Sequence, residues 1–501
     1  MSIALNDACS CYDVTAARGC QLTETAAVAA NQYYDMLRPQ GRRKAPSGVT
    51  MAEDRHLFGT QRRQAIGGIR NLRRNSSILQ WMVAQHLNWV VSATFQSTTG
   101  DKGFDHEAEA WMAEESRAER FEFRKMLSFE QVARLQESHA VLDGDCGTML
   151  LDSGMVQGIE GDRIQDPNQR TTSTADEWYN GVHVRDGVPI EYALHRRRGG
   201  QSSLEFERMV PAENLILHGY YDWRFDQYRG VSPVITAYNQ LVDLYEAESL
   251  WLVKAKIAGL LGMKVRRNTG DAIGAVTSET TYDDSGNPVR KSYQTDFGAG
   301  PWMWDLDPGD DIDMISFDSP GGNTQEFWRF CTAVAMAALD LPYSMWDSTQ
   351  GNFFGNKTAW LAYSRACDVK RARCCATRDK ITAHKYRVSI RDRRIMLPRR
   401  NGTRLTVENR PWQWVPRLMP WWRPLEEVTA ALSAIGGGLS NPYHVCMESD
   451  QGDFEENIDM IAKAMAYAKE RGVPLSYVVG DEVAAAAEKS AEARKKAEAP
   501  K

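Results

Sequence analysis

Two patterns of hydrophobic and polar positions follow one another in the first half of the chain. Residues 61–91 are helical in pattern, and 105–142 continue as helices rich in Glu, Arg and Ala. Further along, the apolar runs are short, and turns such as Asp186-Gly187 separate them, which is typical of β-hairpins. The predicted strands are Cys146–Leu151, Gly181–Val184, Ile190–Leu194 and Asn214–His218. The first half is therefore predicted to be an α+β body with an antiparallel sheet.

A long helix is predicted next. Ser232 suits an N-cap and Pro233 suits a first helical turn, where its missing N–H costs nothing. Apolar residues at helical spacing extend this element to Ala258, a length of about 40 Å. The insert that follows, residues 259–321, is rich in Asp, Gly and Pro, so we predict short strands joined by turns.

A second helix is predicted over residues 322–342. Asn323 can cap it with Glu326 as the partner of a capping pair, and Pro342 stops it. Its apolar stripe is Phe327, Phe330, Val334, Ala338 and Leu341. Two long helices around a small insert suggest a stalk with a tip, an unusual shape for an enzyme active site.

A polar loop and a strongly basic helix follow the second helix. The loop runs from Ser344 to Lys357, and Lys357 to Arg404 holds 15 Lys or Arg against 3 Asp. The basic side chains wind around the helix, so they could face phosphates on one side and acidic neighbours on the other, or form salt bridges within the fold. A tryptophan- and proline-rich connection at 411–424 is predicted to be irregular, and helices return at Leu425–Ile435 and Phe454–Arg471.

Composition excludes several classes of protein. The 501 residues suffice for roughly two to four domains. A hydrophobic content of 43% supports real cores, while a net charge of −6 argues against simple charge-driven coating of nucleic acid. No apolar run approaches the ~18 residues of a membrane span, and the N-terminus lacks the pattern of a signal peptide, so a cytosolic protein without membrane contact is expected.

The nine cysteines are expected to be free thiols, and no metal site is predicted. Cys9, Cys11 and Cys20 fit no standard zinc spacing, and Cys374-Cys375 suits ordinary helix packing.

Two segments superficially resemble chemical motifs. Gly351–Thr358 resembles a phosphate-binding loop, but Asn356 separates Gly355 from Lys357. Cys146 in a tight turn could be a nucleophile, yet no paired histidine is evident, and a core cysteine is the simpler interpretation. We therefore predict no catalytic residues and no cofactor.

The order of short motifs over about residues 60–475 resembles the lambda family of bacteriophage portal proteins. The matching pieces are Arg70–Asn75, Asp143-Gly144-Asp145, Ile159–Ile164, Gly187–Tyr192, Pro211–Asn214 with His218, Arg229–Pro233, Pro308–Asp310, Leu339–Tyr343 and Pro424–Glu427. The chain departs from the family in the loop after Tyr343 and at Leu425, where a Lys is common.

The resemblance implies a portal fold: an α/β wing, a two-helix stem, a small α/β clip and a helical crown, assembled as a ring of about twelve identical subunits. The implied divisions are a flexible N-terminal arm at 1–58, the wing at 59–231, stem helices at 232–258 and 322–342, the clip at 259–321, a channel loop at 343–357, a basic helix returning to the wing at 358–425, the crown at 426–480 and a frayed tail at 481–501.

The implied function is a channel at one capsid vertex, through which double-stranded DNA is packaged and ejected. The implied partners are copies of the chain, the terminase large subunit, head-completion or adaptor proteins, major capsid and scaffold proteins, and DNA without sequence specificity. The virion, with the host cytoplasm during assembly, is the implied location.

Two sets of residues are candidates for this function. The channel-loop residues expected to face DNA are Gln350, Asn352, Phe353, Phe354, Asn356 and Lys357. Possible channel or subunit-interface residues are Lys254, Lys256, Arg365, Lys370, Arg371 and Arg373. The alternatives are a cysteine hydrolase or nuclease, against which the missing catalytic constellation counts, and another, non-portal capsid or connector ring protein.

Overall fold

The computed structural model describes residues 52–167, 176–198, 203–221, 224–259, 263–266, 277–282, 288–294, 311–314, 322–400, 402–417, 421, 423–449 and 451–473. The chain divides into two compact units, residues 1–56 and 57–501. In the first unit the described part contains one short helix, α2 (Glu53–His56). Most of the predicted N-terminal arm (1–58), up to residue 51, and the predicted tail (481–501) lie outside the described residues.

The larger unit begins with helices. The helical pattern at 61–91 forms two helices, α3 (Thr60–Asn75) and α4 (Ser77–Val90), because Ser76 leaves the helical conformation. The Ser76 hydroxyl accepts a hydrogen bond from Leu79 N–H, at 3.3 Å, and so caps α4. The next predicted helical region is confirmed as α5 (Lys102–Glu115), α6 (Ala118–Phe121) and α7 (Phe129–Asp143).

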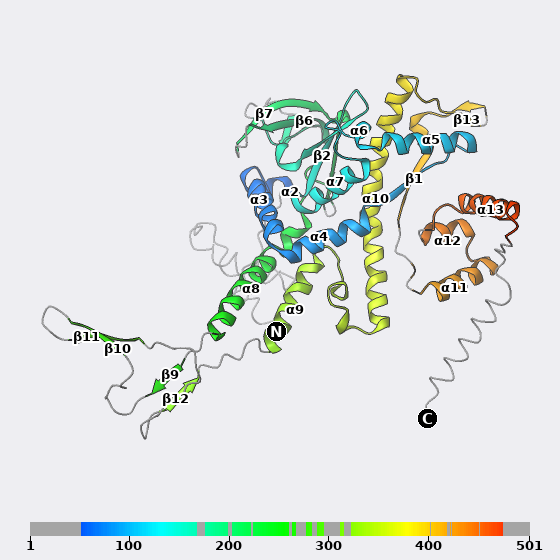
Figure 1. Cartoon of the computed structure of the whole chain (residues 1–501). Coiled ribbons are helices and arrows are strands. Elements are labelled where there is room, and N and C mark those ends of the chain that lie inside the picture. Colours follow the sequence, from blue (N-terminus) through cyan, green and yellow to red (C-terminus); the bar gives the residue numbers. More distant parts are fainter. Residues whose placement is uncertain are drawn as a thin grey trace, which may run out of the picture. The chain divides into compact units, whose positions relative to one another are not determined.

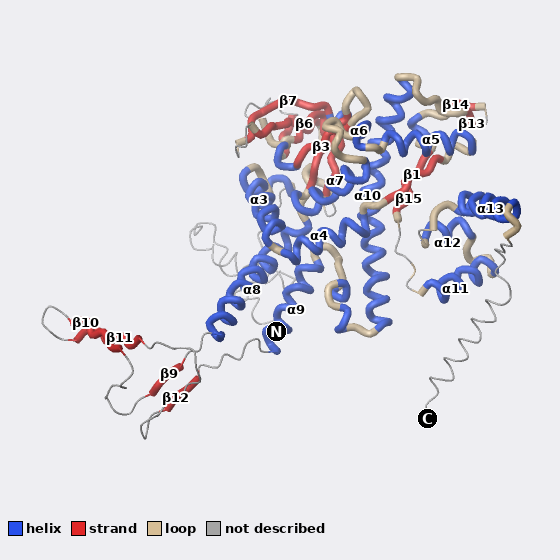
Figure 2. Tube along the Cα trace, in the orientation of Figure 1, coloured by secondary structure: helices blue, strands red, loops and turns tan. Residues whose placement is uncertain are grey.

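Two antiparallel sheets follow, where one was predicted (Figure 2). The three-stranded sheet has the order β3-β2-β8, with β2 at Asp145–Leu150, β3 at Val156–Glu160 and β8 at Leu215–Gly219. The four-stranded sheet has the order β4-β5-β6-β7, with β4 at Asp176–Tyr179, β5 at Val182–Arg185, β6 at Val188–Arg197 and β7 at Leu204–Pro211. Asp186 and Gly187, at φ 52° and 79°, form the predicted hairpin turn between β5 and β6.

Apolar side chains hold these elements together. Helix α7 packs on β2 and β8, and one core joins both sheets through residues such as Ile159, Val182 and Leu194. A larger core lies among α3, α4, α7, the start of α8 (Tyr238–Gly259), the end of α9 (Gly322–Ala337) and α10 (Phe353–Arg391). Helix α7 therefore connects the packing of the sheets with that of the helices at the base of the predicted stem.

The two predicted stem helices lie side by side (Figure 1). A short 3₁₀ turn, Pro233–Ala237, precedes α8 (Tyr238–Gly259), and Ser232 caps this turn by accepting a hydrogen bond from Val234 N–H. The second helix, α9 (Gly322–Ala337), contacts α8 partly through the rings of Trp251 and Trp328, whose centroids are 5.4 Å apart. The described part of the insert consists of strands, as predicted: β9 (Met263–Arg266) pairs with β12 (Asp311–Met314), and β10 (Thr277–Tyr282) pairs with β11 (Pro288–Gln294).

Helix α9 differs from its prediction at both ends. It begins at Gly322, so Asn323 lies inside the helix rather than at its cap. It ends at Ala337, because the chain turns through Asp340, at φ 60°, before Pro342. Residues before a proline avoid helical conformation, which agrees with this earlier end.

The basic segment forms the longest described helix, α10 (Phe353–Arg391), of 39 residues. Its first turn takes up residues 353–357 of the predicted loop; before it lie two short 3₁₀ turns, Tyr343–Met345 and Ser348–Gln350. A small hairpin follows, formed by β13 (Arg399–Arg400) and β14 (Thr403–Arg404).

The connection predicted to be irregular contains a strand, β15 (Trp412–Pro416), which pairs with β1 (Ala93–Ser97). That pairing joins segments more than 300 residues apart, which no local pattern reveals. The helices predicted after it are α11 (Pro424–Gly436) and α13 (Phe454–Glu470), and the structure adds α12 (Pro442–Glu448).

Candidate functional site

The base of the predicted stem is organised around Asp145, the first residue of β2. Its carboxylate, which is fully buried, accepts hydrogen bonds from two arginines: Arg229 Nε and Nη2 at 2.7 Å each, and Arg62 Nη2 at 3.0 Å. Gly230 N–H donates a further bond at 2.8 Å. Burial opposes ionisation, but the charges of Arg229 and Arg62 lower the pKa of Asp145. The aspartate is therefore an anion that holds two cations in the interior.

Arg229 extends this network to the main chain. Its guanidinium also donates to the carbonyls of Gly161 and Ile164, at 2.8 Å each, and to that of Asn180. Arg229 is 1% exposed. Through these hydrogen bonds its one side chain connects β2, the turn after β3 and the turn between β4 and β5.

Glycines let two chain segments meet beside this carboxylate. A Cβ atom added to Gly230 would lie 2.1 Å from the carbonyl oxygen of Gly144, and one added to Gly144 would lie 2.4 Å from the oxygen of Gly230. Two residues later, the Ser232 hydroxyl donates to the carbonyl of Val141 at 2.6 Å. The segment leading into α8 is thus fixed directly to the end of α7.

A second ion cluster adjoins the first. Arg70 Nε and Nη2 donate to the Asp143 carboxylate at 2.8 and 2.6 Å, and Arg70 also pairs with Glu160 and Asp162. Several motifs quoted for the family resemblance, which are far apart in the sequence, therefore meet at the base of the stem. Sequence reasoning found these motifs but not their pairing.

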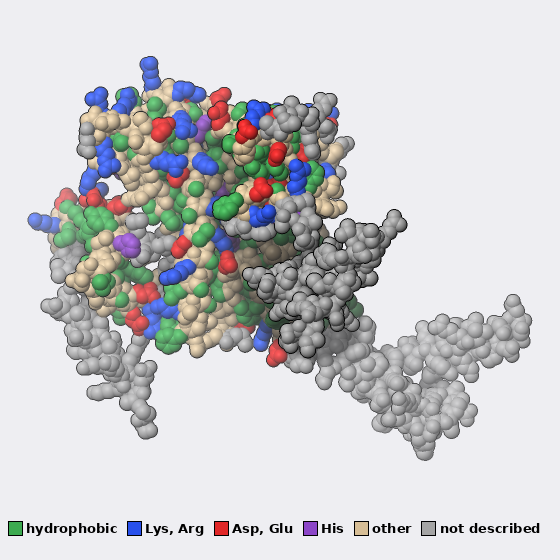
Figure 3. Space-filling view, turned by 180° about the vertical axis from the view of Figure 1, so that it is seen from behind, with side chains coloured by type: hydrophobic (Ala, Val, Ile, Leu, Met, Phe, Trp, Pro, Cys, Tyr) green, Lys and Arg blue, Asp and Glu red, His purple; other side chains and the backbone are tan. Residues whose placement is uncertain are grey.

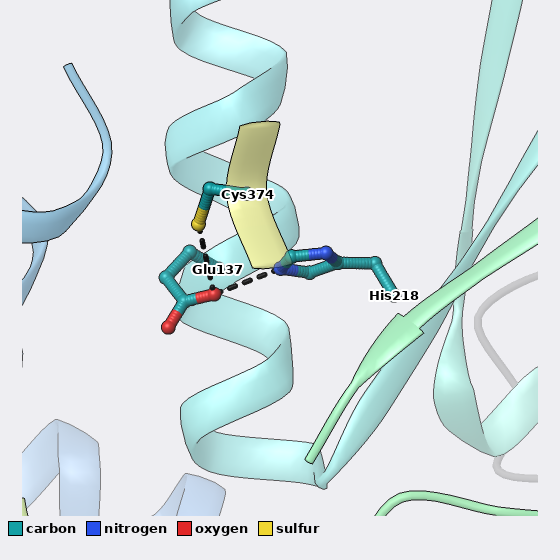
Figure 4. A group of neighbouring side chains, drawn as sticks. All are labelled: Glu137, His218 and Cys374. Carbon is teal, nitrogen blue, oxygen red and sulfur yellow. Dashed lines mark hydrogen bonds and ion pairs between the residues drawn. The ribbon is translucent and has the colours of Figure 1, made fainter. Parts of the chain in front are cut away.

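A third network surrounds Glu137 of α7 (Figure 4). Its carboxylate lies 2.7 Å from His86 Nε2, 2.8 Å from His218 Nε2 and 2.9 Å from Arg373 Nη2, and it accepts a hydrogen bond from the Tyr220 hydroxyl at 3.0 Å. Burial alone would raise the pKa of Glu137, but the hydrogen bonds of the two histidines and the charge of Arg373 hold it well below its usual value.

Glu137, His218 and Cys374 also carry the donor types of a metal site, and their ligand atoms lie within 4.8 Å of one another. In the structure, however, these side chains bond to one another and the carboxylate also binds Arg373. The Cys374 thiol lies 3.4 Å from the carboxylate that His218 already contacts, and burial raises the thiol pKa well above its usual value. The Arg373 guanidinium neutralises the carboxylate, so a metal cation would have to compete with it. This group is better described as a hydrogen-bonded core network than as a metal site.

The sequence left open whether the basic residues of α10 face phosphates or form salt bridges within the fold. Lys370 donates to the Leu339 carbonyl and pairs with Asp340, both within 2.9 Å. Arg371, 1% exposed, donates to the Trp89 carbonyl, and Arg373 binds Glu137. Lys370 and Arg371 are buried and Arg373 is half-buried, and all three form contacts within the fold, which favours the alternative of salt bridges and hydrogen bonds inside the subunit for these residues.

The other candidates of that set are placed differently. Arg365 and Lys256 are exposed, on α10 and α8. The side chain of Lys254 lies outside the described part of the structure, as does that of Gln350.

The predicted channel-loop residues lie at the start of α10. Asn352 caps this helix, because its side-chain oxygen accepts a hydrogen bond from Gly355 N–H at 2.6 Å. Phe354 is 77% exposed, whereas Lys357 pairs with Glu427 of α11 at 3.2 Å. The Arg423 guanidinium lies over the Phe353 ring, 4.3 Å from its centroid, and Asn356 is half-buried.

Cys146 does not support the alternative of a cysteine hydrolase. It lies buried in β2, its thiol donates to the Gln136 carbonyl at 3.5 Å, and burial raises the thiol pKa well above its usual value. A nucleophilic cysteine needs an environment that lowers the thiol pKa.

Among the described helices, none combines the length and apolar character of a membrane span.

The fold and its buried ion networks define a structural subunit: an α/β body, a two-helix stem with a strand-built insert, and a separate group of C-terminal helices. The sequence model "Phage portal protein, lambda family" matches residues 41–371, about two-thirds of the chain. The chain belongs to this family of portal proteins, and its role is that of a portal or connector.

Other comparisons are more distant. A chain from the "Neck of empty GTA particle computed with C6 symmetry" is 15% identical with a TM-score of 0.35, over 61% of this chain and 81% of that one. A chain from the "Virion of native gene transfer agent (GTA) particle" is 14% identical with a TM-score of 0.42, over 76% of this chain and 92% of that one. No curated protein matches.

Proposed function

We propose that copies of this chain assemble side by side into a closed ring, whose channel conducts double-stranded DNA at one vertex of a capsid. The observation that carries this proposal is an exposed apolar stripe on α9. Phe327, Phe330 and Val334 are 58%, 66% and 38% exposed, and they share one helix face at i, i+3 and i+7.

This stripe differs from its C-terminal continuation. Ala338 and Leu341, predicted to belong to the same stripe, pack in or against the main core, while Ala335 and Met336 are fully buried. Helix α9 is therefore already packed on one side and offers a second apolar face. The neighbouring helix α8 exposes Leu250, Leu252 and Val253 as well. Exposed apolar residues at helical spacing favour a covering partner, and in a cyclic assembly that partner is a second copy.

Replacing Phe327 and Phe330 together by Ser is expected to prevent ring assembly and leave the subunit folded. Burying each ring is worth about 1.5–3 kcal/mol, so losing two weakens each interface on the order of a hundredfold or more. Native mass spectrometry and negative-stain class averages measure the effect. The matched control replaces the exposed Val188 and Phe206 by Ser. Rings that form equally well in both variants would remove the basis of the proposal.

The start of α10 is the proposed DNA-facing part of this channel. Exposed side chains there, Asn352 and Phe354, combine a polar group with a compliant aromatic one. A channel that lets DNA slide needs contacts directed at the backbone, without base recognition. Lys357 contributes a cation that pairs with Glu427. Phe353 and Asn356 belong to the first turn of α10, and Gln350 precedes this turn in the chain.

Phe354→Ser is expected to lower the amount of DNA retained per capsid. Because Phe354 is 77% exposed, its replacement should change subunit stability by no more than about 0.5 kcal/mol, so a packaging defect would report on the channel. Phe225→Ser, at a fully exposed phenylalanine elsewhere in the chain, is the control. The measurement is the DNA content of purified capsids; equal packaging and retention in variant, control and unsubstituted protein would refute the assignment.

The remaining partners belong to the same proposal. The clip strands between α8 and α9 would dock the terminase large subunit and later the head-completion or adaptor proteins, while the wing and crown would contact major capsid and scaffold proteins. The ring would assemble in the host cytoplasm and occupy the virion vertex. A pull-down of the terminase large subunit by the full chain and by a variant that lacks residues 263–314 tests the clip assignment. Retained binding by the shortened variant would contradict it.

A further inference from the structure

A dense group of exposed positive charges begins near the C-terminal end of α10. Residues 387–410 contain eight arginines, no lysine and two acidic residues, although the whole chain has a net charge of −6. All eight are exposed: Arg387, Arg391, Arg393, Arg394, Arg399, Arg400, Arg404 and Arg410. In the space-filling view, basic side chains gather along the upper edge of the molecule (Figure 3). We call these eight residues the arginine surface.

The arginine surface rests on a fixed base. Ile395, Leu397 and Val407 are each 6% exposed and pack in the core formed with α5 and the end of α10. Arg394 Nη1 pairs with Glu115 of α5 at 3.0 Å, which orients the segment between helix and hairpin. The exposed residues between these anchors therefore point away from a rigid support rather than from a free loop.

The hairpin itself carries uncompensated charge. Arg399 of β13 lies directly opposite Arg404 of β14, and Arg400 is next to this pair. Like charges at directly opposed positions of an antiparallel ladder destabilise it. Within the described residues, the cations near the hairpin outnumber the carboxylates Asp392 and Glu408, which already pair with Arg391, Arg394 and Arg387. An external polyanion would relieve this repulsion.

We propose that the arginine surface binds the phosphate backbone of double-stranded DNA outside the channel. Duplex DNA carries one negative charge per roughly 1.7 Å, a density that matches clustered cations. Arginine suits this role because its planar fork contacts two phosphate oxygens at once. Residues 387–410 contain no aromatic side chain on which unpaired bases could stack, which favours an intact duplex over a single strand.

This surface is separate from the proposed channel contact. The 39 residues of α10 span about 58 Å, and the arginine surface lies at and beyond its C-terminal end, whereas Asn352 and Phe354 lie at its start. The inference therefore goes beyond the proposed function and assigns a second, sequence-independent DNA contact to the chain.

The test is binding of the full-length protein to relaxed, covalently closed circular duplex DNA, measured by electrophoretic mobility over a range of salt concentrations. A closed circle cannot thread through a closed ring, so it reports on outer surfaces. Replacing Arg399, Arg400 and Arg404 together by Gln is expected to weaken binding on the order of a hundredfold at 0.1 M salt and to lower the salt slope by about 2.7.

A matched variant replaces three exposed arginines elsewhere, Arg74, Arg117 and Arg198, by Gln and should bind nearly as the unsubstituted protein does. Equal binding by the hairpin variant, or no binding by the unsubstituted protein, would overturn the inference. So would tighter binding of poly-glutamate than of DNA at equal charge, which would identify an acidic protein as the partner. Because the assay also works with single subunits, failure of ring assembly would leave it interpretable.

Discussion

Asp145→Ala is expected to unfold or severely destabilise the subunit, by about 3–5 kcal/mol. The substitution removes a carboxylate that bonds to both Arg62 and Arg229, and with it negative charge that balances two buried guanidiniums. Loss of a partner from a buried ion network costs far more than loss of a surface pair, because the remaining charge stays out of water. Chemical denaturation of the purified chain, followed by circular dichroism, measures the difference.

The control for this experiment is Asp392→Ala. Asp392 pairs with Arg391 and Arg394, but its side chain and those of both arginines are at least 40% exposed. Surface pairs of this kind contribute about 0–1 kcal/mol. If the two alanine variants were equally stable, the buried network around Asp145 would not be what holds the base of the stem together.

Gly230→Ala is expected to be nearly as damaging, through shape rather than charge. The added methyl group would lie 2.1 Å from the Gly144 oxygen and 3.0 Å from the Asp145 Cβ atom, so the main chain has to move. Overpacking typically costs about 1–3 kcal/mol, and the upper end or more applies here because the obstacle is backbone. The same denaturation experiment, with ring assembly measured in parallel, detects it.

Gly67→Ala is the opposite case and serves as the matched control. Gly67 lies inside α3, and a Cβ atom there meets nothing within 4 Å. Alanine in a helix interior is favoured over glycine by about 0.5–1 kcal/mol, so this variant should gain stability. A Gly230 variant as stable as the Gly67 variant would show that the two chain segments separate without cost.

Local patterns were sufficient to predict the α+β class and the order of most elements. The 3.6-residue repeat and the cap at Ser232 predicted a helix from Ser232 to Ala258, whose first residues form a 3₁₀ turn before α8, and Asp186-Gly187 predicted the hairpin of β5 and β6. These features depend on residues a few positions apart, so the sequence contains the whole signal. The strand β15 was missed because its partner, β1, is distant in the chain.

The residues of the candidate site were likewise predicted only in part from the sequence. The sequence by itself determined that residues 357–404 are basic and helical over most of their length, and which motifs the family shares. Only the tertiary structure decided which of those charges are available. It buries Lys370 and Arg371 and half-buries Arg373, where carboxylates or main-chain carbonyls of other segments hold them, and it leaves Arg399, Arg400 and Arg404 on the surface. The physical reason is that a charge becomes buried or exposed according to partners brought together by folding, and the distance between those partners along the chain gives no hint of their meeting.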